Sequence, residues 1–371
     1  MNKSPGRRTL AVAFMVTSII APFLYASEQP PEPVDDWTGI VRDSPYWVSQ
    51  GVYKNIITIR HWVLKESGYC SDPDRHILFN MRGQFLGYID DENSRKATQK
   101  RLNDTRRALA TSGRADNWAV GGPGKTGYPF ALSCDQPHVN LDEAVARYLG
   151  TLPSALIWGA WDDLVFASQE NPESLHEALM YVYETRQQRN NLPAKLPTYL
   201  AGQVLIESSG QQRAHSIADA KGILQLSPSA LSDCQIKPAN HWHRLAQIDC
   251  ALRLMNQNAR NLQEPFNRRF GDLPDEKRDR LFTLLLVQAY HGGASRIEAL
   301  LEDDTLSRPA AYFAREHDNF SAGDIAFGMV FHNLGRDRFG LASLYYVADV
   351  QLAAEALCKS ARLGGASFCN L

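Results

Sequence analysis

The sequence lacks a charge excess of either sign, a C-x-x-C pair and an internal repeat. Its 39 Lys and Arg nearly balance 41 Asp and Glu, so no whole-chain field favours a nucleic-acid partner. Paired cysteines at that spacing are typical of zinc and thiol-redox sites, and neither class finds support. A hydrophobic content of 44% in 371 residues still supports a sizeable core, in one large domain or two.

A phosphate-binding loop is also missing. The stretch "NWAVGGPGKTGYP" contains Gly-Lys-Thr, but Ala119 stands where the motif requires its first glycine. We therefore expect a Gly/Pro loop and no nucleotide. The triplet His241-Trp242-His243 has no acid or cysteine at a convincing ligand spacing, so we expect no metal there. It is better interpreted as a loop with exposed aromatics, in which Trp242 could pack on a sugar ring.

No long unbroken hydrophobic run is present either. Basic residues precede the stretch "LAVAFMVTSIIAPFLY", which Thr, Ser and Pro interrupt and which is too short for a comfortable membrane span. We expect a signal peptide over residues 1–26, a Pro-rich linker over 27–36 and a periplasmic location. An uncleaved N-terminal anchor is the alternative. No cysteine follows the run, so a lipoprotein is not expected.

Six cysteines in an exported chain predict disulfides. Sequence alone leaves many pairings open. We expect neighbours along the chain to pair: Cys70 with Cys134, Cys234 with Cys250, and Cys358 with Cys369.

Hydrophobic periodicity predicts a mainly α protein with two parts. Residues 37–190 form a mixed α/β module of unknown role, and residues 191–371 form a helical domain. The first part contains a hairpin over His76–Asp90 and a basic helix capped by Ser94 or Asn93. The remaining predicted helices cover 141–150, 154–168, 172–190, 278–293 and a closing helix over 340–365.

One acid stands in apolar sequence near the end of a predicted helix, in "PTYLAGQVLIESSG". Glu207 occupies the last turn before Gly210, at the negative end of the helix dipole. That position and the apolar neighbours both disfavour its charge and raise its pKa. A carboxyl that keeps its proton near neutral pH can protonate a glycosidic oxygen. A simple solvent-exposed acid at a helix end is the alternative. Ser227-Pro228 predict the cap and first residue of the following helix.

Three ordered blocks begin with this acid. The first runs from Glu207-Ser208 through Ala214-His215-Ser216 to "GILQLSP" over 222–228. The second is "QIDCALRLM" over 247–255, and the third is "AYHGG" over 289–293. This order resembles the soluble lytic transglycosylases, whose catalytic domain has a goose-type lysozyme-like fold. The resemblance covers roughly Leu196 to Val350.

The resemblance implies roles for individual residues. Glu207 matches the catalytic acid, Ser216 and Gln225 match residues that hold polar groups of the sugar, and Tyr290 matches a tyrosine near the acid. His291 stands where the family has Asn, and it either replaces that hydrogen-bond partner or is a satisfied core histidine.

The implied reaction cleaves the β-1,4 bond between N-acetylmuramic acid and N-acetylglucosamine in peptidoglycan. It leaves a 1,6-anhydro end and requires no cofactor. The glycan strand is the expected partner, with an envelope assembly as a possible further one. Two rivals remain: a hydrolytic lysozyme on the same fold, and a non-catalytic wall-binding protein with a degenerate site.

The sequence also departs from the family pattern. Asp219, Gly210 and Ser227 stand where the family has Gly, Phe and Met, and the late stretch "ASLYYV" lacks the family's acid. Helical spacing assigns Tyr345 and Tyr346 in that stretch to core packing.

Overall fold

The computed structural model describes residues 37–65, 74–122, 126–134, 139–152, 155–187 and 192–369. The expected signal peptide and linker lie outside the described residues. From residue 37 onward the described chain belongs to one compact unit. Its division at residue 190 into two functional parts stays a prediction. Within the described part, none of the helices combines the length and apolar content that crossing a membrane requires.

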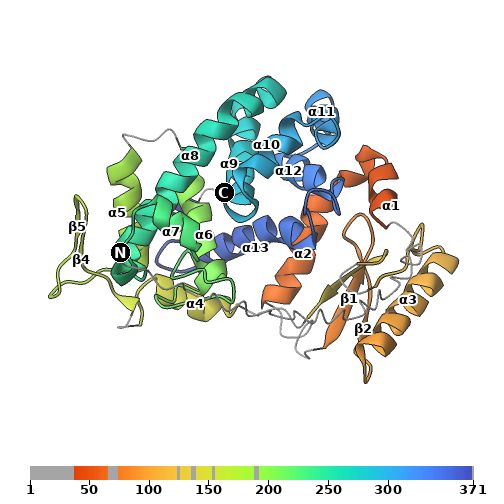
Figure 1. Ribbon diagram of the computed structural model, residues 1–371, viewed down its shortest axis with the longest axis horizontal. Helices are drawn as coiled ribbons and strands as arrows, with labels where there is room; N and C mark the ends of the chain where they lie inside the picture. Colours follow the sequence, from red (N-terminus) through yellow and green to blue (C-terminus); the bar gives the residue numbers. More distant parts are fainter. Residues whose placement is uncertain are drawn as a thin grey trace, which may run out of the picture. The chain divides into compact units, whose positions relative to one another are not determined.

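The protein is mainly helical with a small antiparallel sheet, as predicted (Figure 1). Residues 37–187 contribute α1 (Trp37–Asp43), η1 (Tyr46–Ser49), α2 (Val52–Lys65), α3 (Arg95–Thr111), α4 (Leu141–Tyr148) and α5 (Leu175–Gln187). Residues 192–369 contribute α6 (Leu196–Ser208), α7 (Pro228–Asp233), η3 (Pro238–Asn240), α8 (Arg244–Phe270), α9 (Asp275–Gly292), α10 (Ala294–Glu302), α11 (Arg308–Arg315), η4 (His317–Asn319), α12 (Ala322–Phe331), α13 (Leu341–Cys358) and η5 (Ser367–Cys369).

The sheet contains β1 (Arg75–Phe79), β2 (Phe85–Asp90) and β3 (Phe130–Ser133) in the order β2-β1-β3. β1 and β2 form the predicted hairpin, and its turn includes Gly83 with a φ of 70°. A positive φ is a conformation that glycine adopts without steric cost. The predicted basic helix is α3, and the Ser94 side chain caps it by accepting a hydrogen bond from the Ala97 amide.

The helix predicted over 154–168 is wrong. This stretch forms a second hairpin of β4 (Gly159–Trp161) and β5 (Leu164–Phe166), joined by Asp162 and Asp163. Asp162 adopts a φ of 52°, which aspartate tolerates better than most residues. Alternate residues of β5 are buried and exposed, which is the period of a strand. The tight turn at Asp162 and Asp163 therefore decides in favour of a hairpin, although the apolar spacing of this stretch also suits a helix.

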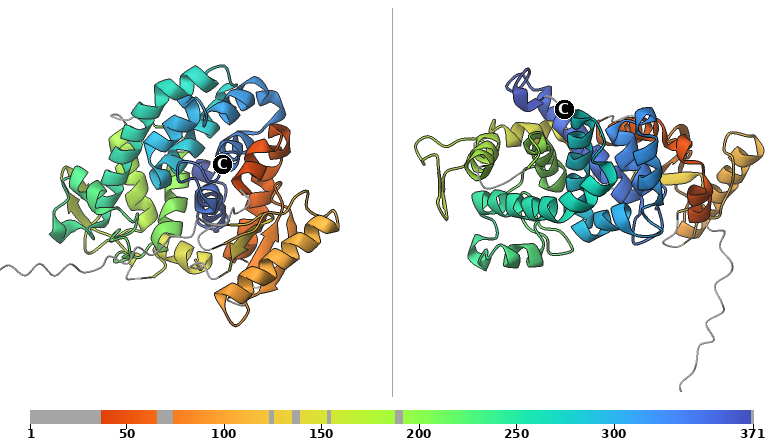
Figure 2. Two further views of the ribbon diagram at one scale, coloured as in Figure 1. Left: turned by 45° about the vertical axis from the view of Figure 1, so that its right-hand side comes forward. Right: turned by 90° about the horizontal axis from the view of Figure 1, so that it is seen from above.

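Two helices form the centre of the molecule. α13 lies between α6 and α2 and packs against both (Figure 1), and Figure 2 shows the same ribbon from two further sides. One apolar cluster includes Tyr199 of α6 and residues 344–348 of α13. A second includes Leu200, Ala201, Val204 and Leu205 of α6 and the later part of α13. α6 and α13 therefore belong to both clusters, and both are apolar around nearly their whole circumference.

The predicted closing helix ends earlier than expected. α13 stops at Cys358, and turns follow it as far as Gly365. The Cys358–Cys369 disulfide draws the chain back at this point. This bridge and Cys234–Cys250 confirm two predicted pairings. They are consistent with an oxidising compartment outside the cytoplasm. The third prediction involves Cys70, which lies outside the described residues.

Candidate functional site

A close crossing of two helices creates the site. A Cβ at Gly202 of α6 would lie only 2.3 Å from the Val350 carbonyl oxygen of α13. Only glycine allows the two backbones to approach so closely. The crossing brings Tyr346 of α13 beside Glu207, which lies in the last turn of α6. The sequence therefore needs Gly202 for the contact between the acid and this tyrosine.

The Glu207 carboxyl is partly buried and receives one side-chain hydrogen bond from the described residues. The Tyr346 hydroxyl donates a hydrogen bond to Glu207 Oε1 over 2.6 Å. Burial raises the pKa of Glu207 to about 7, although the Tyr346 hydrogen bond lowers it. The hydrogen bond stabilises the ionised form, whereas desolvation penalises it, and desolvation is the larger effect. A carboxyl in this balance can give up and regain a proton near neutral pH.

Tyr346 is fixed from two further sides. Gln203, one turn before Glu207 on α6, donates from Nε2 to the Tyr346 hydroxyl oxygen over 3.0 Å. The His291 ring stacks on the Tyr346 ring, with centroids 4.3 Å apart and an interplanar angle of 17°. His291 is otherwise exposed, and desolvation of its ring together with the charge of Arg296 lowers its pKa. Of the two interpretations of His291, the satisfied core histidine does not fit, because the residue is exposed and its ring stacks on Tyr346. Its role as a replacement hydrogen-bond partner stays a prediction.

The chain that follows Glu207 folds back onto the C-terminal end of α6. The Ser208 hydroxyl donates to the Ile223 carbonyl over 2.8 Å and accepts from the Gly210 amide over 3.1 Å. Ser209, with a φ of 53°, ends α6 in the left-handed conformation. These contacts return the chain to the acid, so that residues 222–226 lie close to it.

Gln247 of α8 organises the returning segment. Its Nε2 donates to the carbonyls of Lys221 and His241, and its Oε1 accepts from the Leu224 amide. Gly222 adopts a φ of 76°, and a Cβ there would lie 1.9 Å from the Gln247 amide nitrogen. The motif glycine is thus required both for its backbone conformation and for the approach of Gln247.

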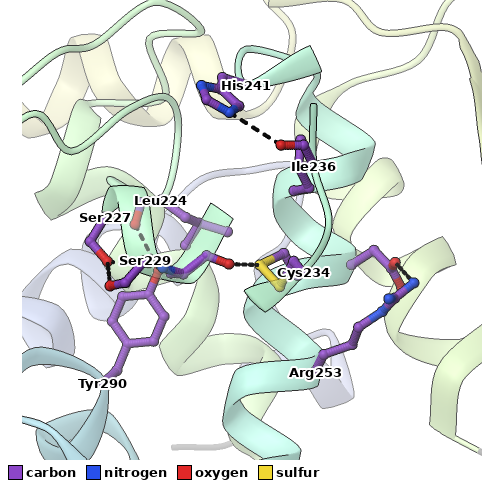
Figure 3. The surroundings of a disulfide bond; sticks show 11 residues. Leu224, Ser227, Ser229, Cys234, Ile236, His241, Arg253 and Tyr290 are labelled. Atoms are coloured by element: carbon purple, nitrogen blue, oxygen red, sulfur yellow. Dashed lines mark hydrogen bonds and ion pairs between the residues drawn. A yellow bond between two sulfur atoms is a disulfide. The ribbon is translucent and has the colours of Figure 1, made fainter. Parts of the chain in front are cut away.

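Tyr290 fastens the same segment to α9. Its hydroxyl donates to the Leu224 carbonyl over 2.7 Å, as Figure 3 shows. Burial raises the pKa of Tyr290 well above its ordinary value, and the charge of Glu207 adds to this rise. The charge of Glu207 therefore acts on Tyr290, and a direct role of this tyrosine beside the acid stays a prediction.

The two remaining predicted residues stabilise the loop. Gln225 donates from Nε2 to the carbonyls of Ala214 and Gly222, each over 3.0 Å, and adopts a φ of 47°. The Ser216 hydroxyl oxygen accepts from the Ala220 amide over 3.0 Å. Gln225 Oε1 and the Ser216 hydroxyl proton enter no hydrogen bond with the described residues, so both can still contact a ligand. No direct contact joins Ser216 to Glu207 in the described structure.

A disulfide closes the far side of this segment. Ser227 caps α7 as predicted, by accepting from the Ala230 amide. Cys234, which follows α7, is bonded to Cys250 of α8 (Figure 3). Because Gln247 lies one turn before Cys250, the same stretch of α8 anchors both ends of the segment from Gly222 to Cys234.

The histidines around Trp242 have structural partners. His243 caps α8 through Nδ1, which accepts from the Ala246 amide, and His241 Nε2 contacts the Ile236 carbonyl. No group of acids, histidines and cysteines suited to a metal ion occurs among the residues that the structure describes.

Sequence reasoning missed three residues of the site. Tyr346 was assigned to core packing; it is indeed buried, but its hydroxyl contacts the acid. Gln203 and Gln247 were not singled out. Each is a lone amide side chain among buried apolar residues of a helix. Because a buried polar side chain requires a hydrogen-bond partner, this pattern could have indicated both residues.

A scan of protein-family models finds none that matches this chain. A search of curated proteins also finds no match.

Proposed function

We propose that the protein is a lytic transglycosylase that cleaves peptidoglycan glycan strands, with Glu207 as the single acid and base. The observation that carries this proposal is the Glu207 carboxyl itself, with a pKa of about 7 and a tyrosine hydroxyl on one oxygen. No other carboxylate among the described residues contributes to that pKa.

The chemistry requires one group to act twice. Neutral Glu207 donates its proton to the oxygen that links N-acetylmuramic acid to N-acetylglucosamine, and the bond to the anomeric carbon breaks. The resulting carboxylate then accepts the proton of the sugar's own 6-hydroxyl while that oxygen bonds to the anomeric carbon. A pKa near neutrality suits both steps, because the group must change its charge in each direction.

Among the described residues, no second acid contributes to the pKa shift of Glu207, which favours this reaction over hydrolysis. Glycosidases with two carboxylates hold them roughly 5–10 Å apart, one as acid and the other as nucleophile or base. Here the described surroundings of Glu207 contain tyrosine, glutamine and histidine instead. An internal nucleophile on the substrate removes the need for the second acid. A periplasmic location is part of the proposal and agrees with the two disulfides.

Digestion of purified sacculi tests the proposal. The wild-type protein should release muropeptides that end in 1,6-anhydro sugars, which are lighter by one water than hydrolysed ends. Glu207→Gln should lower release by roughly 10²–10⁴-fold, because the amide cannot donate the proton. Glu264→Gln is the matched control, since Glu264 is an exposed acid on α8 and should keep full activity.

Three results would contradict the proposal. Products with reducing ends would identify a hydrolase. Undiminished release by Glu207→Gln would remove Glu207 from the chemistry. Binding of sacculi without release by the wild-type protein would identify a wall-binding protein.

A further inference from the structure

We infer that Gln203 is a positioning residue that determines which oxygen of Glu207 carries the transferable proton. The inference rests on the proposed function for its catalytic meaning, but its structural content concerns the chain Gln203–Tyr346–Glu207 alone. Gln203 Nε2 donates to the Tyr346 hydroxyl oxygen, and the Tyr346 hydroxyl donates to Glu207 Oε1.

The direction of this chain follows from the orientation of the Gln203 amide, whose Nε2 faces the Tyr346 hydroxyl while its Oε1 has no hydrogen-bond partner among the described residues. A tyrosine hydroxyl has one proton to donate. Because Gln203 supplies a proton to its oxygen, Tyr346 must direct its own proton elsewhere, and Glu207 Oε1 is the acceptor at 2.6 Å. Gln203 is fully buried, so no water competes for the bond. The stacked His291 ring restricts rotation of the tyrosine.

This hydrogen bond determines the protonation of the second carboxyl oxygen of Glu207, Oε2. Oε1 is committed as an acceptor, so the neutral carboxyl must carry its proton on Oε2. Oε2 receives no hydrogen bond from the described residues, which leaves it for the substrate. The proton passes from Oε2 to the glycosidic oxygen as that oxygen leaves with the bonding electrons. Oε2 then accepts the proton of the 6-hydroxyl during ring closure.

A double-mutant cycle tests the chain without relying on activity. The pKa of Glu207 is measured by carboxyl ¹³C NMR in the full protein for the wild type, Gln203→Met, Tyr346→Phe and the double variant. Gln203→Met should raise the pKa by roughly half a pH unit, since Tyr346 becomes free to accept from the neutral acid. Tyr346→Phe should raise it further.

The double variant provides the decisive comparison. Gln203 acts through Tyr346, so the double variant should match Tyr346→Phe and show no additional rise. Gln351→Met is the control, because Gln351 is a buried glutamine of α13 that contacts the hydroxyl of Tyr53 instead. It should leave the pKa of Glu207 unchanged. Gln203→Leu replaces Gln203→Met if the methionine variant does not fold.

The pH profile of cleavage supplies a second readout. The basic limb of kcat/KM should move to higher pH in Gln203→Met together with the NMR value, whereas a purely structural defect would lower activity at every pH. An unchanged pKa in Gln203→Met, or additive shifts in the double variant, would overturn the inference. Loss of the transglycosylase assignment alone would leave the NMR result intact, so the two failures can be distinguished.

Discussion

Glu207 is subject to two opposing influences. Burial favours its neutral form, and the Tyr346 hydroxyl favours its ionised form. In the proposed reaction, a purely apolar pocket would keep the acid protonated through both steps, and a more polar one would ionise it before the first. The intermediate pKa suits a carboxyl that is proposed to act as acid and then as base.

The same pKa makes the acid destabilising at alkaline pH. The pKa of Glu207 is raised from 4.5 to about 7 on folding, so between these values the folded state binds more protons than the unfolded state. Its contribution to stability is fully present at low pH and falls as pH rises through that window. Glu207→Gln does not titrate there, and it should be more stable than the wild type at pH ~8 by about 1–3 kcal/mol.

Thermal unfolding near pH ~5 and pH ~8 checks this expectation, with Glu264→Gln as the control. The difference between Glu207→Gln and the wild type should be larger at the higher pH. An equal difference at both would mean that Glu207 titrates normally.

The sequence predicts this residue better than it predicts its partner. The lone acid at a helix end and the following blocks identify Glu207 directly. Tyr346 lies 139 residues further along the chain, at a helical position that also fits core packing. Only the crossing of α6 and α13 shows that Tyr346 contacts the acid as well as packing in the core. The local periodicity of the sequence does not predict that crossing.

At the scale of elements, the segment from Gly222 to Leu226 links α6, the helix of the acid, to α8 and α9. Ser208 of α6, Gln247 of α8 and Tyr290 of α9 each bond to its backbone. The predicted motif therefore supplies loop geometry as well as side chains. Its glycine and its glutamine both adopt positive φ, which no pattern of hydrophobic residues reveals.

Gly222→Ala should disrupt this segment. The new Cβ would overlap the Gln247 amide and would force a left-handed conformation on alanine. We expect the free energy of unfolding to fall by about 1–3 kcal/mol more than in Gly113→Ala, and we expect muropeptide release to be lost. Gly113 also has a positive φ, but its Cβ would meet nothing within 4 Å.

Urea unfolding of both variants, combined with sacculus digestion, separates the two effects. If both variants lose the same stability and keep activity, Gln247 does not hold the segment as described.

The hairpin β4–β5 shows why one element was mispredicted. Its residues have apolar spacing that also suits a helix, and only the turn at Asp162 and Asp163 distinguishes a hairpin. Longer helices such as α9 and α13 were predicted correctly in type because several turns repeat the same pattern. Their ends were less certain, since a disulfide beyond Cys358 decides where α13 stops.

At the scale of the whole molecule, the N-terminal part is fastened to the helix that carries Tyr346. Arg60 of α2 forms a two-pronged ion pair with Asp349 of α13, over 2.6 and 2.8 Å. Both side chains are buried, and burial raises the pKa of Asp349 in spite of the arginine. We therefore expect the ion pair to fix the packing geometry of α2 against α13 and to add little to the free energy of unfolding.

Removing one partner should be worse than removing both. Asp349→Asn should lower the free energy of unfolding by about 3–5 kcal/mol, because it leaves a buried guanidinium without its counter-ion. The double variant Arg60→Met/Asp349→Leu should regain most of that loss. Urea unfolding measures both, with the exposed pair Lys100–Asp104 as a control that should change stability by less than about 1 kcal/mol. A double variant as unstable as Asp349→Asn would show that the pair contributes net stability.

The central place of α13 also affects how the chain can fold. Arg60 and Asp349 are 289 residues apart in the sequence. α2 therefore cannot pack against α13 until most of the polypeptide has been synthesised. Contacts of such long range slow folding. A growing chain cannot complete either apolar cluster before residues 341–358 leave the ribosome, so the apolar side chains of both clusters stay accessible to chaperones until then.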